Sequence, residues 1–327
     1  MFSRIPRFVL ALLVAVAALP APAAAQDPIA RGVRLFQQRQ YPAARRALEP
    51  YVQSHPRDAR AAHYLARVHL EERNPDAAIE LLERAVALDG RQSMYHLYLG
   101  NAYGVKAMRA NPLRQALLAR KAKGEFERAV ELAPGNVDAR WGLMRFHMRA
   151  PGLLGGDWNE ALAQAAAIKR AAPYRGAEAF AVLHRHRNNL PAVAAEYEAA
   201  KRRFPDSTAL YFRLANTYDA MGRYDASVAL FEELLRRKPE VMGSYYQIGR
   251  LGAITGRRLP RAEAMLQRYL RHTPRGTEPP LTYAQWRLGM VYERQGNRAG
   301  ALAAYRAAVA LDPRNAQARA ALAKLGT

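Results

Sequence analysis

From residue 27 to the C-terminus, hydrophobic and polar positions follow a helical period. Apolar and small residues recur at intervals of three and four, which places them on one face of a helix. A small residue, a bulky residue four positions later and a closing proline or glycine return as Ala44, Leu48, Pro56; Ala78, Leu82, Gly90; Ala122, Phe126, Pro134; Ser227, Phe231, Pro239; and Ala301, Tyr305, Pro313. No segment alternates with the period of two that is typical of a strand. The sequence therefore predicts repeated helices and no β-sheet.

A second pattern fills the other half of each repeat. A leucine is followed by a small residue and, three positions after it, by a tyrosine, as in Leu99-Gly100…Tyr103, Leu214-Ala215…Tyr218 and Leu288-Gly289…Tyr292. This spacing puts the tyrosines on the helix face that packs against the partner helix, so we expect them in the core. Gly222 and Gly296 follow these helices, and each can adopt the left-handed conformation that ends a helix.

Together the two halves resemble the tetratricopeptide repeat, which combines Leu-Gly-x-x-Tyr, Ala-x-x-x-Phe and a closing proline. The resemblance implies an all-α, right-handed superhelical solenoid of about eight helical hairpins. The eight expected units span residues 27–57, 59–91, 93–136, 137–173, 174–206, 208–240, 242–276 and 282–314. One hairpin cannot bury its apolar face alone, so the units must stack and the ends need polar caps. Residues 315–327 are expected to form the C-terminal capping helix.

Two segments interrupt the repeat. In the third unit, Asn111-Pro112 predicts the start of a lengthened second helix whose inner face carries Leu113, Leu117, Ala122 and Phe126. This hairpin is expected to protrude. It has no acidic residue between positions 91 and 124, and its basic group comprises Lys106, Arg109, Arg114, Arg120, Lys121 and Lys123. In the fourth unit, residues 150–157 lengthen a turn that ends at Asp157, the expected N-cap of the next helix.

The first 25 residues have the order of a secretory signal peptide. Arg4 and Arg7 precede an apolar run from Phe8 to Leu19, and small residues lead to Ala25. The run is shorter than the roughly 20 residues of a membrane span. We therefore expect cleavage after Ala25, a periplasmic or secreted protein, and no transmembrane span afterwards.

Composition adds a strong positive charge to this picture. The formal net charge is +22, and only seven of the 50 basic residues are lysines, which leaves 43 arginines. A GC-rich coding genome explains this bias, and so does recognition of carboxylates or phosphates, which the planar guanidinium binds through two hydrogen bonds. Nucleic acid is not an expected partner, because an exported protein rarely meets it.

No group of residues predicts catalysis. The segment from Gly152 to Asp157 lacks the preceding strand and the Lys-Ser/Thr of a phosphate-binding loop, so it is expected to be a turn. His184 and His186 are two positions apart, whereas a helical zinc pair needs a spacing of four. The chain contains no cysteine, which excludes thiol chemistry and disulfides. We expect no enzyme activity, no metal site and no cofactor.

The resemblance also implies which residues face the concave groove of the solenoid. Counted from the leucine of the first helix of each unit, these positions hold aromatic residues alternating with arginine and asparagine. The candidate groove residues are Arg67, Asn101, Trp141, Arg145, Phe212, Asn216, Tyr246, Arg250 and Trp286. Such a wall suits an extended peptide, because rings stack on it and guanidinium groups form bidentate hydrogen bonds with it.

Some tetratricopeptide-repeat proteins hold a terminal carboxylate with Lys and Asn on one repeat, Asn on the next, and Lys and Arg on a third. In this sequence an asparagine on one repeat is followed by an arginine on the next repeat in two places, Asn101 with Arg145 and Asn216 with Arg250. Both lysines of the clamp are missing in each place.

The leading hypothesis is a periplasmic or secreted adaptor that binds a protein or peptide in its groove. The alternative is a binder of anionic envelope polymer or lipid headgroups that uses its basic surface.

Overall fold

The computed structural model describes residues 27–326, and within them all regular structure is helical. The predicted signal peptide lies outside the described residues. The chain divides into two compact units, a first unit that ends at Gly142 and a second that begins at Leu143. The absence of strands from residues 27–326 confirms the all-α prediction.

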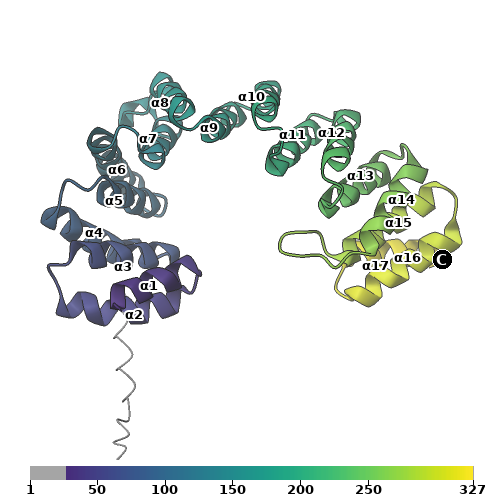
Figure 1. Ribbon diagram of the computed structural model, residues 1–327, viewed down its shortest axis with the longest axis horizontal. Coiled ribbons are helices and arrows are strands. Elements are labelled where there is room, and N and C mark those ends of the chain that lie inside the picture. Colours follow the sequence, from purple (N-terminus) through teal and green to yellow (C-terminus); the bar gives the residue numbers. More distant parts are fainter. Residues whose placement is uncertain (1–26, 327) are drawn as a thin grey trace, which may run out of the picture. The chain divides into compact units, whose positions relative to one another are not determined.

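The first unit contains α1 (Pro28–Gln37), α2 (Tyr41–Ser54), α3 (Ala59–Glu71), α4 (Pro75–Leu88), α5 (Ser93–Ala107) and α6 (Pro112–Leu132). Helix α7 (Val137–Arg149) contains the boundary between the units. The second unit continues with a 3-10 turn (Gly152–Leu154) and α8 (Trp158–Ala171), α9 (Pro173–His186), α10 (Leu190–Arg203), α11 (Thr208–Ala220), α12 (Tyr224–Arg237), α13 (Met242–Thr255), α14 (Leu259–Leu270), α15 (Leu281–Arg294), α16 (Arg298–Leu311) and α17 (Ala316–Gly326). From α1 to α6 and from α8 to α17, helices that follow one another in sequence pack side by side (Figure 1). Sixteen helices followed by α17, which packs on α16, agree with eight hairpins and a C-terminal cap.

In the hairpins, a glycine of the first helix packs against a large side chain of the second helix. A β-carbon placed on Gly100 would lie 2.8 Å from the Phe126 ring, and one on Gly289 would lie still closer to the Tyr305 ring. Distances this short exclude any side chain at these two positions without movement of the ring. The small residues of the repeat therefore let the two helix backbones approach, as the sequence predicted.

Tyrosines of the first helices tie successive hairpins together. The Tyr103 hydroxyl on α5 donates a hydrogen bond to Glu83 on α4, and the Tyr218 hydroxyl on α11 donates to Glu198 on α10. Both rings are buried, as predicted, whereas Tyr292 at the corresponding place in α15 is only half-buried. Burial raises the pKa of Tyr218 to about 12, and the bond to Glu198 acts in the same direction. Each pair thus places a polar group in the core without leaving it unpartnered.

The predicted caps and turns are present. The Asp157 carboxylate accepts the backbone N–H of Asn159 at 2.7 Å, and the Asn111 side chain accepts that of Arg114 at 3.0 Å. Gly222 and Gly296 have φ values of 70° and 75°, in the left-handed region that closes a helix.

No helix among residues 27–326 is both long and apolar enough to cross a bilayer.

Candidate peptide-binding face

In the first unit, Arg67 lies among aromatic rings from three helices. Its guanidinium carbon is 4.6 Å from the centre of the Phe36 ring on α1, 5.3 Å from Tyr64 on α3 and 4.7 Å from Tyr98 on α5. The packing of α3 on both α1 and α5 brings these rings together. Stacking of a guanidinium on aromatic faces is attractive and grows stronger as water is removed. Arg67 therefore holds the first helices of three successive hairpins together on one face.

His63 lies one turn before Arg67 on α3 and extends the same cluster. Its ring centre is 5.0 Å from those of Tyr95 and Tyr98, and only 5% of the residue is exposed. Burial and, to a smaller extent, the positive charge of Arg67 lower the pKa of His63 to about 3. The imidazole is therefore neutral at physiological pH and acts as an aromatic ring.

Asn101 on α5 and Trp141 on α7 are both half-buried. Trp141 belongs to the first unit, whereas Arg145, on the same helix, belongs to the second and is exposed. The Asn101 and Arg145 pair proposed from the sequence is thus divided between the two units.

In the second unit, arginines on successive first helices are matched by carboxylates. Arg213 on α11 forms an ion pair with Glu178 on α9 at 2.7 Å. Arg250 on α13 pairs with Asp219 on α11, and its Nε donates to Gln247 Oε1 at 2.5 Å. The side chains of Arg250 and Asp219 are only 21% and 16% exposed. Arg250 is therefore already occupied, which argues against the proposed carboxylate clamp formed by Asn216 and Arg250.

Arg287 on α15 is the exception in this row, because it contacts no carboxylate among residues 27–326. Its guanidinium lies 4.0 Å from the Trp286 ring, and its Nη1 donates to the Met290 sulfur at 3.3 Å. Its Nε is buried without a hydrogen-bond partner. Burial lowers the pKa of Arg287, the hydrogen bond and electrostatic interaction with Tyr246 oppose this shift, and the neighbouring charge of Arg250 adds to it. A half-buried cation without a counter-charge favours an incoming anionic group.

The other candidate residues of the second unit differ in accessibility. Phe212 is half-buried and packs edge-on against Phe231, with ring centres 5.1 Å apart. Asn216 is exposed and Trp286 is half-buried. Tyr246 is only 7% exposed, and its ring packs on Tyr269 at 5.5 Å. It contributes to the core, so little of its ring is left for a ligand.

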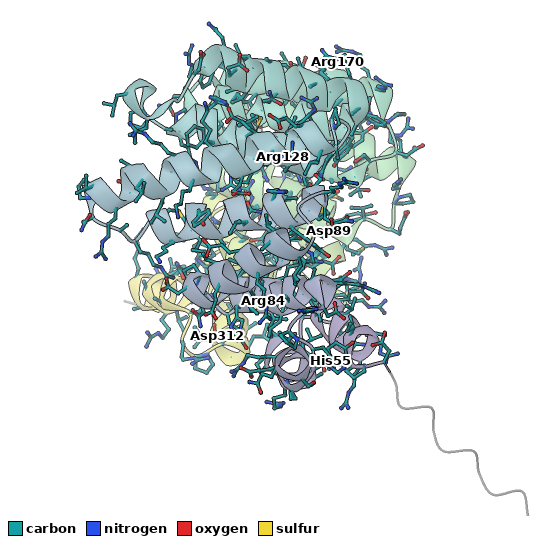
Figure 2. The ribbon with its side chains drawn as sticks, turned by 90° about the vertical axis from the view of Figure 1, so that its left-hand side faces the viewer. His55, Arg84, Asp89, Arg128, Arg170 and Asp312 are labelled. Atoms are coloured by element: carbon teal, nitrogen blue, oxygen red, sulfur yellow. The ribbon has the colours of Figure 1, made fainter. Side chains whose placement is uncertain are left out.

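The basic hairpin of the first unit requires a correction. Leu113 and Leu117 do not face inward as expected, since they are 84% and 59% exposed, whereas Ala122 and Phe126 are buried. Lys121 of α6 lies beside Tyr103 of α5, so the N-terminal end of α6 extends past Ala107, the last residue of α5, which leaves this end without cover from α5. Figure 2 shows the helix that carries Arg128 extending beyond its neighbours in the first unit.

The charges of this hairpin are also partly neutralised, which the sequence did not predict. Lys106 forms an ion pair with Asp76 of the preceding hairpin at 2.6 Å, and Lys123 pairs with Glu127 at 3.1 Å. Lys121 has its ammonium 5.1 Å from the centre of the Tyr103 ring. Neither Arg114 nor Arg120 forms an ion pair with a carboxylate of the part of the chain that the structure describes.

Sequence reasoning missed several residues of both faces. Arg287 directly follows the candidate Trp286, and Tyr64 and Tyr98 precede the candidates Arg67 and Asn101 by three residues. A spacing of three places residues on neighbouring parts of one helical face, which was the available signal. Asp219 gave no such signal, because its role depends on Arg250 of the next hairpin.

Comparison with known proteins identifies the repeat. One family model, described as the tetratricopeptide repeat, matches residues 29–103 and 212–277, and a second with the same description matches residues 282–315. These segments make up more than half of the chain. A search of curated protein sequences finds no significant match.

Solved structures share the fold at low sequence identity. A thermophilic tetratricopeptide-repeat protein of Thermus thermophilus is 23% identical with a TM-score of 0.50, over 59% of this chain and 97% of that one. Yeast Tom70 is 14% identical with a TM-score of 0.54, over 95% of this chain and 65% of that one. With more than half of its length matched by the family models and helices that pack in succession, the chain belongs to the tetratricopeptide-repeat family.

Proposed function

We propose that this protein is a non-catalytic scaffold that binds an extended, carboxylate-bearing protein segment on the first helices of its second unit. Tetratricopeptide-repeat proteins generally act as protein-binding scaffolds. The observation that carries the proposal is the contrast between Arg287 and the arginines beside it. Arg213 and Arg250 have their own carboxylates, whereas Arg287 has the Trp286 ring and the Tyr246 hydroxyl, a buried Nε without a partner, and no carboxylate among the described residues. A carboxylate from a bound segment would complete this row of ion pairs.

A library of extended peptides that differ in their acidic residues tests the proposal. The wild-type protein is expected to select peptides with a carboxylate, and Arg287→Gln is expected to weaken their binding about tenfold or more, as for the loss of a hydrogen bond to a charged group. Arg319→Gln is the matched control, because Arg319 on α17 is exposed and the variant loses the same charge. Equal weakening by both variants, or selection without regard to acidic residues, would contradict the proposal.

We also propose that the scaffold works in the periplasm or outside the cell. The support is the apolar run from Phe8 to Leu19 followed by small residues up to Ala25. Sequencing the N-terminus of protein recovered from the periplasmic or secreted fraction should give Gln26 as the first residue. A chain that still begins at Met1 and stays in the cytosol would refute export.

A further inference from the structure

The tip of the α5–α6 hairpin exposes large apolar side chains close together. Met108 is 68% exposed, Leu113 84% and Leu117 59%. Soluble domains often carry isolated exposed leucines, but a group of them on a protruding element is typical of an interaction surface. We call Met108, Leu113 and Leu117 the apolar tip.

The leucines of the apolar tip form a stripe along α6. Leu113, Leu117, Arg120 and Gly124 are spaced by four, three and four residues, so they lie on one helical face. A β-carbon on Gly124 would meet no atom within 4 Å, so the stripe is uncovered as far as Gly124. This part of α6 therefore presents its leucines to the surroundings and not to a neighbouring helix.

Positive charge lies along one side of this stripe. Arg114 and Lys121 lie about 100° and 80° around the helix from Leu113, at 100° per residue, and Arg120 lies within the stripe. Arg109, in the turn that follows α5, donates to the backbone carbonyl of Arg73 at 3.4 Å, a neutral acceptor that does not offset the positive charge. Within the described residues none of these four side chains pairs with a carboxylate, and the first turn of α6 contains no acid. The positive end of the helix dipole adds to the same field.

We propose that this tip docks on an anionic phospholipid bilayer, with its leucines among the acyl chains and its arginines at the phosphates. A helix with leucines along one face and basic residues beside them lies in the bilayer interface with the apolar face inserted. Long arginine side chains reach back from an apolar stripe to the headgroups, which accommodates Arg120. Residues 91 to 124 contain no acid, and Asp76, which approaches from the preceding hairpin, is already paired with Lys106, so the remaining arginines make the tip complementary to anionic lipids.

Sedimentation with vesicles tests the electrostatic part. The protein is used as isolated with its N-terminus determined, because residues 8–19 would themselves enter a bilayer if retained. Wild type is expected to sediment with vesicles of phosphatidylglycerol and phosphatidylcholine at low salt, and not with phosphatidylcholine alone. Substituting Arg109, Arg114 and Arg120 together with glutamine should weaken partitioning on the order of a hundredfold. The matched control substitutes the exposed Arg46, Arg57 and Arg91, which removes the same charge from the first unit.

Insertion of the leucines is tested separately. Leu113→Ser with Leu117→Ser should weaken partitioning about tenfold or more without changing the melting temperature, because both side chains are exposed. The chain has no cysteine, so Leu117→Cys gives a single site for a polarity-sensitive fluorophore. Its emission should shift to the blue on anionic vesicles, whereas the same label at Leu153→Cys, also on an exposed leucine, should not shift.

Several results would overturn the proposal. The wild type would fail to sediment with anionic vesicles, or would bind neutral vesicles equally well. The arginine control variant would lose as much partitioning as the variant of the tip, or the labels at positions 117 and 153 would show the same emission shift. A blue shift at position 117 that depends on protein concentration without vesicles would assign the apolar tip to a contact between copies of the chain instead.

Discussion

Arg67 in the first unit and Arg250 in the second occupy the same place in their helices, the ninth residue of α3 and of α13. Arg67 is held by three aromatic rings and its Nε has no hydrogen-bond partner, whereas Arg250 is held by Asp219 and Gln247. The residue type and position in the repeat are the same, yet one arginine keeps an uncompensated charge and the other does not. The electrostatic character of such a face therefore depends on the neighbouring repeats more than on the arginine itself.

The largest expected effect comes from removing the partner of Arg250. Asp219→Ala should lower the free energy of unfolding by about 2 kcal/mol, because it leaves a mostly buried guanidinium without its carboxylate. Chemical denaturation of the single and double variants measures this. The double variant Asp219→Ala with Arg250→Met should recover most of the loss, since replacing both members of a buried pair is often neutral. A double variant as unstable as the sum of the single ones would show that the pair contributes nothing.

The neutral state of His63 gives the next effect. Its pKa is lowered to about 3, so between its ordinary value of about 6.5 and that value the unfolded chain binds a proton that the folded chain does not. The stability that comes from the neutral His63 is therefore fully present above about pH 6.5 and is lost as the pH falls below that value. From pH 6.5 to pH 5 the loss should be about 1.6 kcal/mol.

Denaturation curves at these two pH values, for wild type and His63→Phe, measure that loss. The phenylalanine keeps an aromatic ring beside Tyr95 and Tyr98 but does not titrate, so the variant should lose less stability on acidification. Burial also lowers the pKa of His69, so some pH dependence should persist. The same loss in both proteins would show that His63 is not held neutral.

The smallest expected effect concerns the rings around Arg67. The coupling free energy between Arg67 and Tyr98 should be about 1 kcal/mol, as for a partly desolvated cation on an aromatic face. A double-mutant cycle with Arg67→Met and Tyr98→Leu measures it by denaturation. The coupling should change little with salt. A coupling near zero would mean that Arg67 is only packed among these rings, and the contrast with Arg250 would disappear.

Sequence alone was sufficient for the helices and their pairing. The small residues at Gly100 and Gly289, the turn glycines Gly222 and Gly296, and the Asn111 cap were predicted correctly, because each depends on residues close in sequence or in the same hairpin. The candidate site was predicted less completely. Tyr246 was expected in the groove and is buried, and Arg250 was expected to be available and is paired.

Only the tertiary structure decided which charged side chains are paired and which apolar side chains are buried. Whether Lys106 is free depends on Asp76 of the preceding hairpin, and whether Leu113 is buried depends on where α5 ends beside α6. The helical period assigns a side chain to a face but does not say what covers that face. Partners some 30 residues away, such as Asp219 for Arg250, come within reach only when the hairpins stack, and that stacking sets which arginines keep an unsatisfied charge.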